Sequence, residues 1–600
     1  SRDSLIPPQG LAMLTGKGFY KKDHEDSPQE SFARAATCYC FGDYEFAQRI
    51  YDYVSLQWFT FASPVLSNAV DVKWPDAKGD DLFQSMAIWL KDNVTPEGMP
   101  ISCFLNAISD SKESLVDNRT ETAWLSVMGG GVGIYAGNRS PDEKSTGIMR
   151  HLRGYDADTL AYRQTSTRRG SMCAYADINH PEINNFMDMR NPVGGESSLK
   201  CFNLNNGVNV NDEFYEAVIS GDDIELIDPK HGPTGRFQSA REVWEKLMDM
   251  RYTTGEPFIN NIDTVNRNIP KWITKPTYKV LQSNLCTEIT LMTSKKRTAV
   301  CCLSSLNLEK RDEWKDTQIV QDLVRLLDNV IEYFIQLAPP VLSRAIHSAK
   351  QERAIGIGTL GFHSYLQSKS IAFESGGFNS AAQVNHNIYR SIKKAAIEGS
   401  KQLATERGEC EDCLGSGMRN SHLLAIAPNA SSSSLVNVSP SIEPFAANAF
   451  NAQGRAGSFL ITNKWLKIVL QGHDKDDQAT WNSIINNKGS VQHLDFLSDH
   501  DKLVFKTSYE IEQRWIIEHA AGRQPEICQA QSVNVFMRLG TTKQYMSDLH
   551  LLAWKLGVKS LYYCRAEAPT TASVTSGPIM DTVNKKPNKI EFNECFACEG

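Results

Sequence analysis

An amide, a thiol and a carboxylate alternate along one short stretch of the chain, Ser283 to Ile289. Asn284, Cys286 and Glu288 stand at every second position, so on an extended backbone their side chains point to the same side. On a helix, Asn284 and Glu288 would share a face and Cys286 would point away. Grouped together, the sulfur can act on a C–H bond as a radical, the carboxylate can accept a hydroxyl proton, and the amide can orient a second hydroxyl. We therefore expect a strand or an extended loop. The alternative is a buried structural cysteine, because free cysteine often behaves as a small apolar residue.

Two further motifs contain cysteines that could take part in the same chemistry. Cys103 lies in the sequence Pro-Ile-Ser-Cys-Phe-Leu, and Cys301 and Cys302 lie in the largely apolar stretch Ala299 to Leu308. Neighbouring residues of a strand face opposite sides of a sheet, so only one of Cys301 and Cys302 should face the same space as Cys286. Strand geometry alone does not choose between them.

Together these motifs resemble the large, catalytic subunit of ribonucleotide reductase, in the form found in class I enzymes. The resemblance rests on Asn-Leu-Cys-x-Glu at 284–288, Ala-Val-Cys-x-Leu-Ser-x-x-Asn-Leu at 299–308 and Ser-Cys-x-Leu at 102–105. It extends from about residue 50 to residue 600.

The resemblance implies a division of labour among these residues. Cys286 becomes a thiyl radical and removes hydrogen from C3′ of the ribose. Glu288 takes the 3′-hydroxyl proton, and Asn284 holds the substrate hydroxyls. Cys103 and Cys301, the latter selected over its neighbour by alignment with the motif, supply two reducing equivalents as the 2′-hydroxyl leaves as water. They finish as a disulfide, whose Cα atoms lie about 5.5–6 Å apart, so the fold must bring two distant segments together.

A run of small hydroxyl residues follows the apolar stretch Leu423 to Ala427. Hydroxyls and backbone N–H groups after a strand can hold phosphate, especially where a helix begins. A serine-rich linker is the alternative, but the apolar residues Leu435 and Val436 on the far side argue against it. By resemblance, the substrate contacts are Ala430, Ser431, Ser432, Ser433, Ser63, Ser102 and Gly131.

The densest glycine run, Gly129 to Gly137, formally fits a dinucleotide-binding fingerprint with Asp156 as its acidic partner. No convincing strand precedes the run, and Asp156 does not end an apolar strand, so we reject that interpretation. The resemblance instead makes the run a place of close backbone packing against substrate, near a loop that binds a nucleoside triphosphate effector. By resemblance, the effector contacts are Asp110, Arg139 and Arg190, and residues 190–201 relay effector identity to the substrate site.

Two adjacent tyrosines, Tyr562 and Tyr563, stand near the end of the chain. Ordinary strand packing of two aromatic rings is the alternative to a functional role. In class I enzymes of the family, such a pair passes an oxidising equivalent to the active-site cysteine. It comes from a separate small subunit with a metal or radical cofactor, so the resemblance predicts that partner and no covalently bound cofactor in this chain.

A Cys-x-x-Cys pair, Cys595 and Cys598, closes the sequence. Such a pair can cycle between dithiol and disulfide, so on a flexible arm it could reduce the active-site disulfide and then meet thioredoxin or glutaredoxin. A zinc site shared with Cys410 and Cys413 is the alternative. Zinc modules usually keep their ligand pairs closer in sequence, and the acidic residues around the first pair disfavour thiolates. We expect no metal in this chain.

The composition is that of an ordinary globular protein. Hydrophobic residues make up 41% and charged residues 22% of 600 residues, with a net charge of −7, which excludes a broad nucleic-acid surface. The beginning of the sequence lacks a secretory signal, and no apolar run reaches membrane-spanning length. Many thiols without a disulfide-scaffold density indicate a reducing, cytoplasmic setting.

Strand-like runs alternate with helical patterns after about residue 100, which favours a mostly parallel sheet or barrel. The predicted strands include 101–107, 278–281, 423–427 and 560–563, and the clearest helices span 241–250, 318–337 and 381–407. The resemblance implies a ten-stranded α/β barrel made of two five-stranded parallel halves, with Cys286 on a loop inside. We divide the chain into a mainly helical region (1–98), the catalytic barrel (99–567) and a flexible redox-active tail (568–600).

Three other functions compete with this interpretation: a cobalamin-dependent reductase, a glycyl-radical enzyme and a zinc-bound scaffold. The tyrosine pair argues against the first two. The family resemblance leaves no room for a complete N-terminal ATP-cone, so we expect that dATP does not switch the enzyme off through such a module. We also expect a homodimer, without DNA or membrane partners.

Overall fold

The computed structural model describes residues 2–16, 20–76, 79, 81–162, 170–454 and 457–567. As predicted, the N-terminal region is mainly helical. Its helices are α1 (Pro8–Thr15), α2 (Pro28–Cys38), α3 (Tyr44–Ser55), α4 (Ser63–Ser67) and α5 (Leu82–Asn93). One short strand, β1 (Phe59–Phe61), leaves this region and pairs antiparallel with β9 (Ala299–Asn307) in the sheet. The helical region is thereby joined directly to the barrel wall.

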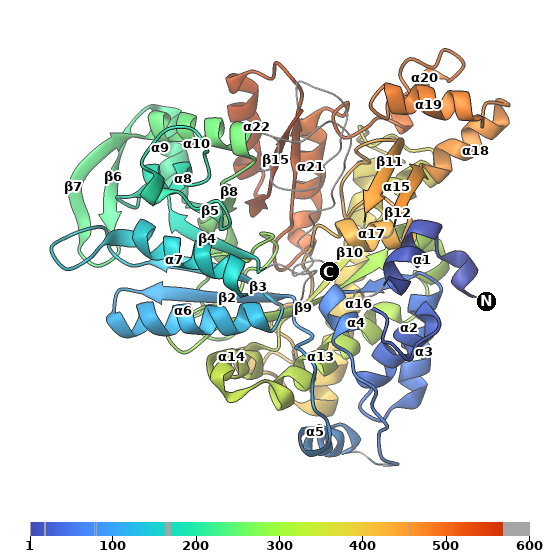
Figure 1. Cartoon of the computed structure of the whole chain (residues 1–600), viewed down its shortest axis with the longest axis horizontal. Coiled ribbons are helices and arrows are strands. Elements are labelled where there is room, and N and C mark those ends of the chain that lie inside the picture. Colours follow the sequence, from blue (N-terminus) through green and yellow to red (C-terminus); the bar gives the residue numbers. More distant parts are fainter. Residues whose placement is uncertain are drawn as a thin grey trace.

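The first half of the barrel is a five-stranded parallel sheet, on the left of Figure 1. Its strands, in spatial order, are β2 (Cys103–Ser109), β3 (Gly131–Gly137), β4 (Met172–Asp177), β5 (Asn205–Val210) and β8 (Phe258–Asn261). The intervening elements are α6 (Lys112–Val127), α7 (Gly147–Ala161), α8 (Ile183–Asp188), α9 (Asp212–Ser220), the β6 (Asp223–Asp228) and β7 (Gly232–Ser239) hairpin and α10 (Ala240–Thr254), and α11 (Ile262–Arg267) follows β8. The side chains of β2 and β4 are almost wholly buried, as parallel strands covered by helices require.

The second half closes the ring. Strand β10 (Ile355–Leu360) runs parallel to β9, and residues 423–427 and 529–533 continue the parallel order through the bridges Ile357–Leu424 and Ile426–Gln531. The next segment contains β14 (Ser560–Leu561), and the N–H of Tyr562 donates to the Val533 carbonyl at 2.8 Å. β9 is antiparallel to β2, and β14 is antiparallel to β8. The two parallel halves therefore meet antiparallel at both edges, and the predicted ten-stranded barrel is confirmed.

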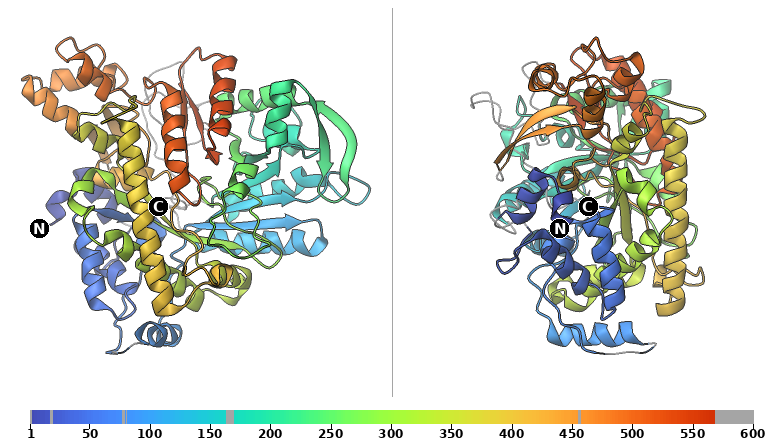
Figure 2. Two further views of the ribbon diagram at one scale, coloured as in Figure 1. Left: turned by 180° about the vertical axis from the view of Figure 1, so that it is seen from behind. Right: turned by 90° about the vertical axis from the view of Figure 1, so that its right-hand side faces the viewer.

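Buried helices support the second half from outside. Helix α13 (Ile319–Leu337) packs against the long α16 (Ala381–Arg407), which Figure 2 shows along the back of the molecule, and against α14 (Ser343–Glu352). The same part of the chain contains the short helices α12 (Arg311–Trp314) and α15 (Phe362–Ser368). Asp328 of α13 is fully buried and forms ion pairs with Arg353, Arg407 and Arg419 at 2.7, 2.8 and 3.4 Å. These guanidinium groups hold the pKa of Asp328 far below its ordinary value, although burial opposes them.

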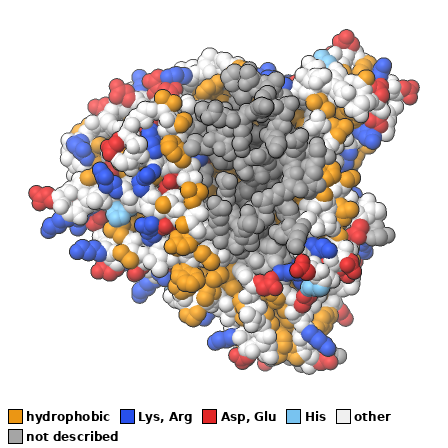
Figure 3. Space-filling model, in the orientation of Figure 1, with side chains coloured by type: hydrophobic (Ala, Val, Ile, Leu, Met, Phe, Trp, Pro, Cys, Tyr) orange, Lys and Arg blue, Asp and Glu red, His pale blue; other side chains and the backbone are white. Residues whose placement is uncertain are grey.

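The remaining elements begin with helix α17 (Ala430–Val436). Those that follow it are β11 (Ala449–Gly454), β12 (Gly457–Thr462), α18 (Lys464–Gly472), α19 (Gln478–Asn486), α20 (Asp499–Val504), α21 (Gln513–Arg523), β13 (Val535–Met537), α22 (Lys543–Lys555) and β15 (Cys564–Ala566). Helices α18 to α20 project at the upper right of Figure 1 around a small core of their own. Figure 3 shows Lys and Arg side chains interspersed with Asp and Glu on one face. Within the described residues, each helix is too short or too polar to cross a bilayer.

Two sequence predictions about strands need correction. Residues 278–281 do not form a strand; only Val280 makes an isolated bridge, to Met292. This segment enters the barrel, and its neighbours hydrogen-bond to the barrel wall, as when Asn209 Nδ2 donates to the Leu281 carbonyl at 2.7 Å. The glycine run, in contrast, is itself strand β3 from Gly131 onward. The division of the chain at residues 98 and 567 stays a prediction.

Candidate active site

A loop of residues 281–293, called the central loop here, runs into the barrel and carries Asn284, Cys286 and Glu288. The Tyr175 hydroxyl on β4 donates to the Asn284 carbonyl at 2.6 Å. On β3, a Cβ atom added to Gly133 would lie 2.1 Å from the Ser283 carbonyl oxygen, so only glycine lets the loop approach this closely. The loop is thus fixed by two neighbouring strands of the first half.

The tip of the central loop is a turn rather than the extended segment expected from the alternating pattern. Thr287 has φ +70°, a conformation that a β-branched residue rarely adopts, and its N–H donates to the Asn284 carbonyl at 3.4 Å. Cys286 and Glu288 flank this strained residue and are 2% and 0% exposed. The side chains converge because the backbone reverses direction at this turn. The two-residue alternation of side chains along an extended strand does not describe this geometry.

Two of the three predicted groups, Asn284 and Glu288, contact a thiol from β2. Asn284 Nδ2 lies 3.3 Å from Cys103 Sγ, and Cys103 Sγ lies 3.7 Å from Glu288 Oε1. The Tyr562 hydroxyl lies 3.6 Å from Cys286 Sγ. The amide, the carboxylate and the Cys103 thiol therefore lie together in buried surroundings, and Cys286 of the same loop lies against Tyr562.

Cys103 and Cys301 stand directly opposite each other in the antiparallel register of β2 and β9. Such pairs have Cα atoms about 4.5–5.5 Å apart, which overlaps the range that a disulfide needs. Cys302 faces the other way, with its Sγ 3.4 Å from the Leu327 carbonyl of α13. The register of β9 thus distinguishes the two neighbouring cysteines, and it selects Cys301 for the barrel interior.

Burial sets the protonation of this site. It raises the pKa of Glu288 to about 7, while contacts with Asn284, Cys103 and Ser532 lower it in part. Burial also raises the pKa of Cys301 well above its ordinary value, and the nearby Cys302 and Cys103 add to the effect. Cys301 is therefore a neutral thiol near pH 7, able to donate a proton or a hydrogen atom, while Glu288 is poised to exchange a proton.

The predicted phosphate-binding residues start two short helices. Ser431, Ser432 and Ser433 are buried in the first turn of α17, directly after Asn429 in the left-handed region. Ser63 begins α4, and its hydroxyl lies 2.9 Å from that of Tyr20. A helix start after a strand is the geometry expected for phosphate contact.

Ser102 and Gly131 lie beside the thiols. Ser102 directly precedes Cys103, and its carbonyl accepts the Gly131 N–H at 3.0 Å. These two predicted substrate contacts therefore stand together at the beginnings of β2 and β3.

The tyrosine pair lies next to the central loop. The ring centroids of Tyr562 and Tyr563 are 4.4 Å apart, and Phe258 packs against both rings at 4.6 and 5.0 Å. Arg251, fully buried, donates to the Tyr562 carbonyl at 2.9 Å and fixes the backbone of the pair. The rings thus form a continuous contact from Tyr563 through Tyr562 to Cys286.

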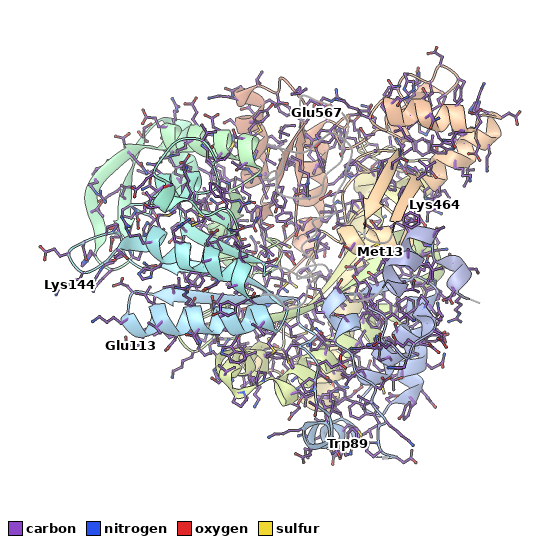
Figure 4. All side chains as sticks on the ribbon, in the orientation of Figure 1. Met13, Trp89, Glu113, Lys144, Lys464 and Glu567 are labelled. Atoms are coloured by element: carbon purple, nitrogen blue, oxygen red, sulfur yellow. The ribbon has the colours of Figure 1, made fainter. Side chains whose placement is uncertain are left out.

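Two of the three predicted effector residues lie together. The Arg139 N–H donates to Asp110 at 3.1 Å, and the side chains form an ion pair at 3.5 Å at the ends of β2 and β3. Arg190 makes its described ion pair elsewhere, with buried Glu256 at 3.1 Å. Figure 4 shows Glu113 of α6 and Lys144, after β3, pointing outward on the same side of the molecule.

Three residues that the sequence analysis missed help to build the site. Tyr175 holds the central loop, as described above. Gln529 lies with Nε2 3.5 Å from Cys301 Sγ and accepts the Thr290 N–H at 3.0 Å, and Ser532 Oγ lies 3.5 Å from Glu288 Oε2. Gln529 and Gln531 do alternate with smaller residues in a buried segment, but that signal alone does not indicate a function.

The structure describes one of the two Cys-x-x-Cys pairs and not the other. Cys595 and Cys598 lie outside the described residues. Cys410 and Cys413 are buried at the short turn Glu411–Cys413, where the Cys413 N–H donates to the Cys410 carbonyl at 3.0 Å. Within the described ranges, His, Cys, Asp and Glu side chains form no group of three or more suited to a metal ion.

This combination of a closed α/β barrel, a central loop bearing a thiol and a facing cysteine pair defines a barrel oxidoreductase that works through thiols. The barrel-domain model of ribonucleotide reductase matches residues 101–416 and 410–564, and the all-alpha domain model of the same enzyme matches residues 8–73. The chain therefore belongs to the ribonucleotide reductase large-subunit family, and the resemblance drawn from the motifs is confirmed.

Individual relatives agree with the family models. The chain is 44% identical to a putative ribonucleoside-diphosphate reductase large subunit of Frog virus 3, over 95% of each chain. It is 40% identical to the ribonucleoside-diphosphate reductase large subunit of Invertebrate iridescent virus 3, over 100% of this chain and 99% of that one. Among solved structures, it resembles the class Id ribonucleotide reductase alpha subunit of Actinobacillus ureae with a TM-score of 0.79 and 32% identity, covering 93% of this chain and 98% of that one.

Family membership settles the broad function. The chain is the catalytic subunit of a ribonucleotide reductase, an oxidoreductase that reduces ribonucleotides to 2′-deoxyribonucleotides. Its likeness to a class I alpha subunit implies a radical supplied by a partner beta subunit. This outcome favours the main interpretation over the cobalamin-dependent and glycyl-radical alternatives.

Proposed function

We propose that the chain reduces ribonucleoside diphosphates, with Cys286 as the residue that carries the radical. The observation that carries this proposal is the contact of Asn284 and Glu288, on the loop that bears Cys286, with Cys103, which lies directly opposite Cys301 in the register of β2 and β9. The choice of diphosphates follows the named activity of the relatives from Frog virus 3 and Invertebrate iridescent virus 3.

In this reaction Cys286 and Glu288 each act once in each direction, whereas Cys103 and Cys301 are oxidised once. Cys286, as a thiyl radical, takes the hydrogen atom from C3′ and becomes a thiol. Glu288 accepts the 3′-hydroxyl proton, while the 2′-hydroxyl takes a proton from the cysteine pair and leaves as water. Cys103 and Cys301 give two electrons, their second hydrogen forms the new C2′–H bond, and their sulfurs close into a disulfide. Glu288 then returns its proton, and Cys286 returns its hydrogen atom to C3′, so that one ribonucleotide and two thiols yield one deoxyribonucleotide, one disulfide and water.

The radical reaches Cys286 through Tyr563 and Tyr562 from the metal or radical cofactor of the small subunit. The support is the contact of the two rings and the 3.6 Å approach of the Tyr562 hydroxyl to Cys286 Sγ. Both tyrosines are held by neighbours inside the barrel wall, which shields an oxidised ring from water and stray reductants.

The disulfide of each cycle must be reduced inside the barrel. Cys103 and Cys301 are both 0% exposed, so a large reductant cannot reach them directly. We assign their reduction to Cys595 and Cys598, which then exchange with thioredoxin or glutaredoxin. The need for reduced thiols favours a cytoplasmic setting.

The first turns of α17 and α4 hold the substrate phosphates through Ala430, Ser431, Ser432, Ser433 and Ser63. Ser102 and Gly131 contact the sugar side. A nucleoside triphosphate effector binds near Asp110 and Arg139. Arg190 lies on the segment that connects the effector region to the site.

A second copy of the chain covers the exposed side of α6. Val116, Trp124 and Val127 are 65%, 42% and 38% exposed there, and burying them in a homodimer would remove apolar surface from water.

Cys286→Ser tests the central assignment. With the small subunit and a chemical dithiol present, the variant should form no deoxyribonucleotide, because serine cannot carry the radical, yet it should bind substrate as tightly as the parent. Cys38→Ser, which alters a buried cysteine of α2 in the N-terminal helical region, should keep its turnover. Measurable product from Cys286→Ser would overturn the assignment.

A further inference from the structure

A polar cluster of the buried Glu256 and Arg190 and the partly buried Asn205 contacts the hydroxyl of Tyr563, at the outer end of the tyrosine pair. Asn205, the first residue of β5, places its Nδ2 3.4 Å from the Tyr563 hydroxyl and donates from the same nitrogen to Glu256 Oε1 at 2.6 Å. Glu256 Oε2 in turn pairs with Arg190 Nε at 3.1 Å. The cluster thus links the residue expected in the effector region to the proposed radical route.

The geometry around Glu256 fixes its charge. Three donors converge on the carboxylate: Arg190 Nε, the Asn206 N–H at 3.1 Å and Asn205 Nδ2. A carboxylate accepts hydrogen bonds at both oxygens, whereas a protonated carboxyl would need an acceptor for its own hydrogen. Burial raises the pKa of Glu256, and Arg190 opposes that rise.

An ionised Glu256 also decides how the amide of Asn205 is turned. An amide has a donor end and an acceptor end of nearly the same shape. Because Glu256 only accepts, it must face the NH₂ group, and the same NH₂ group then faces the phenol oxygen of Tyr563. In the opposite orientation, the Asn205 carbonyl would face Tyr563 and would take the phenol hydrogen.

We propose that Glu256 is a positioning residue for Tyr563, which it controls by fixing the orientation of the Asn205 amide. The proposal rests on the radical route through Tyr563 and Tyr562 put forward above. It assigns to Glu256, Asn205 and Arg190 a role in radical entry rather than in holding substrate.

The orientation matters because the step between the two tyrosines moves a proton with an electron. The Tyr563 radical takes one electron and one proton from the Tyr562 hydroxyl, so that Tyr563 becomes a phenol again and Tyr562 becomes the radical. An N–H donor serves the Tyr563 oxygen in both states, since the oxygen accepts in both. A carbonyl would instead bind the phenol hydrogen and hold it away from Tyr562 during the return step.

Other contacts fix the position of the Tyr563 ring, so the Asn205 amide acts mainly on the hydrogen bonding of the Tyr563 hydroxyl. A Cβ added to Gly255, which has φ +84°, would lie 3.3 Å from the Tyr563 ring. Phe258 packs edge-on against the ring at 5.0 Å, and Arg565 lies over it at 5.0 Å. Loss of Glu256 should therefore change hydrogen bonding at the oxygen more than the position of the ring.

The test compares Glu256→Gln and Asn205→Leu with the parent, each as the full chain assayed with the small subunit. Glutamine can either accept from or donate to Asn205, so the amide is no longer fixed, and leucine removes the donor entirely. We expect kcat to fall about 10- to 100-fold with KM unchanged and a larger solvent deuterium isotope effect. With 3-aminotyrosine at position 563, the trapped radical should show an altered electron paramagnetic resonance spectrum, which a purely structural defect would not produce.

Glu352→Gln is the matched control, because Glu352 is also fully buried and accepts from a tyrosine, Tyr278, at 2.8 Å. It should retain the parent kcat and radical spectrum. Tyr563→Phe separates the two proposals. If Tyr563→Phe keeps full turnover, the radical route itself is wrong. If Tyr563→Phe is inactive while Glu256→Gln and Asn205→Leu match the parent in kcat and spectrum, the route stands and the positioning role of Glu256 is overturned.

Discussion

Cys301 and Cys302 carry the same thiol on the same strand, yet they face different surroundings. Cys301 lies opposite Cys103, whereas Cys302 packs against α13. We predict that Cys301→Ser loses turnover with any reductant, because no disulfide can form, while Cys302→Ser keeps the parent rate. Steady-state assays with a small dithiol measure both variants. Equal losses in the two would show that the register of β9 does not determine which thiol reacts.

Glu288 gives a pH dependence whose sign follows from its role. It must be ionised to accept the 3′-hydroxyl proton, and burial raises its pKa to about 7. We therefore predict that kcat/KM rises with pH through an apparent pKa near 7 and is lost on acidification below it. Initial rates measured across neutrality test this. In Glu288→Gln, kcat should fall about 10²- to 10⁴-fold and the inflection should vanish. An inflection near the ordinary value of 4.5 would contradict the argument.

At the scale of elements, the central loop depends on a close backbone approach at β3. Gly133→Ala would place a methyl group 2.1 Å from the Ser283 carbonyl oxygen, and a backbone atom cannot move aside without moving the loop. We predict a loss of stability of about 1–3 kcal/mol and a strong loss of activity, measured by thermal unfolding and turnover. Gly472→Ala, at the end of α18 with open space around it, should change neither. A fully active Gly133→Ala would mean that the loop tolerates displacement.

The elements also show what the sequence could and could not predict. Helical periodicity located α16 with its observed bounds, 381–407, and α13 to within one residue, because each buries a continuous apolar stripe. The same reasoning placed a strand at 278–281, where the chain instead enters the barrel. The turn at Thr287 has no local signal, since its positive φ is imposed by the tertiary contacts of the loop.

In the candidate site too, some residues could be predicted from the sequence and others could not. Motif spacing indicated Cys286, Glu288 and Asn284, and the family resemblance added the pair of Cys103 and Cys301. Gln529 and Ser532 were missed because their positions beside Cys301 and Glu288 follow only from closure of the second half of the barrel. Contacts between segments so distant in the chain produce no periodic pattern in the sequence of either segment.

At the scale of the whole molecule, α6 joins the proposed effector region to an exposed apolar surface. It begins at Lys112, just after Asp110, and lies at the lower left of Figure 1; its residues Val116 and Trp124 are exposed to solvent. We predict that Val116→Glu combined with Trp124→Glu dissociates the homodimer, because each buried carboxylate would replace apolar contact worth about 1.5–3 kcal/mol. That cost corresponds to a rise in Kd of about tenfold or more for each substitution, measurable by sedimentation velocity.

Phe378→Glu, at a residue that is 84% exposed in the loop before α16, is the control and should leave the dimer intact. Unchanged dimerisation in the double variant would place the contact between subunits on another surface, whereas loss of both the dimer and the effector response would show that the two depend on the same helix.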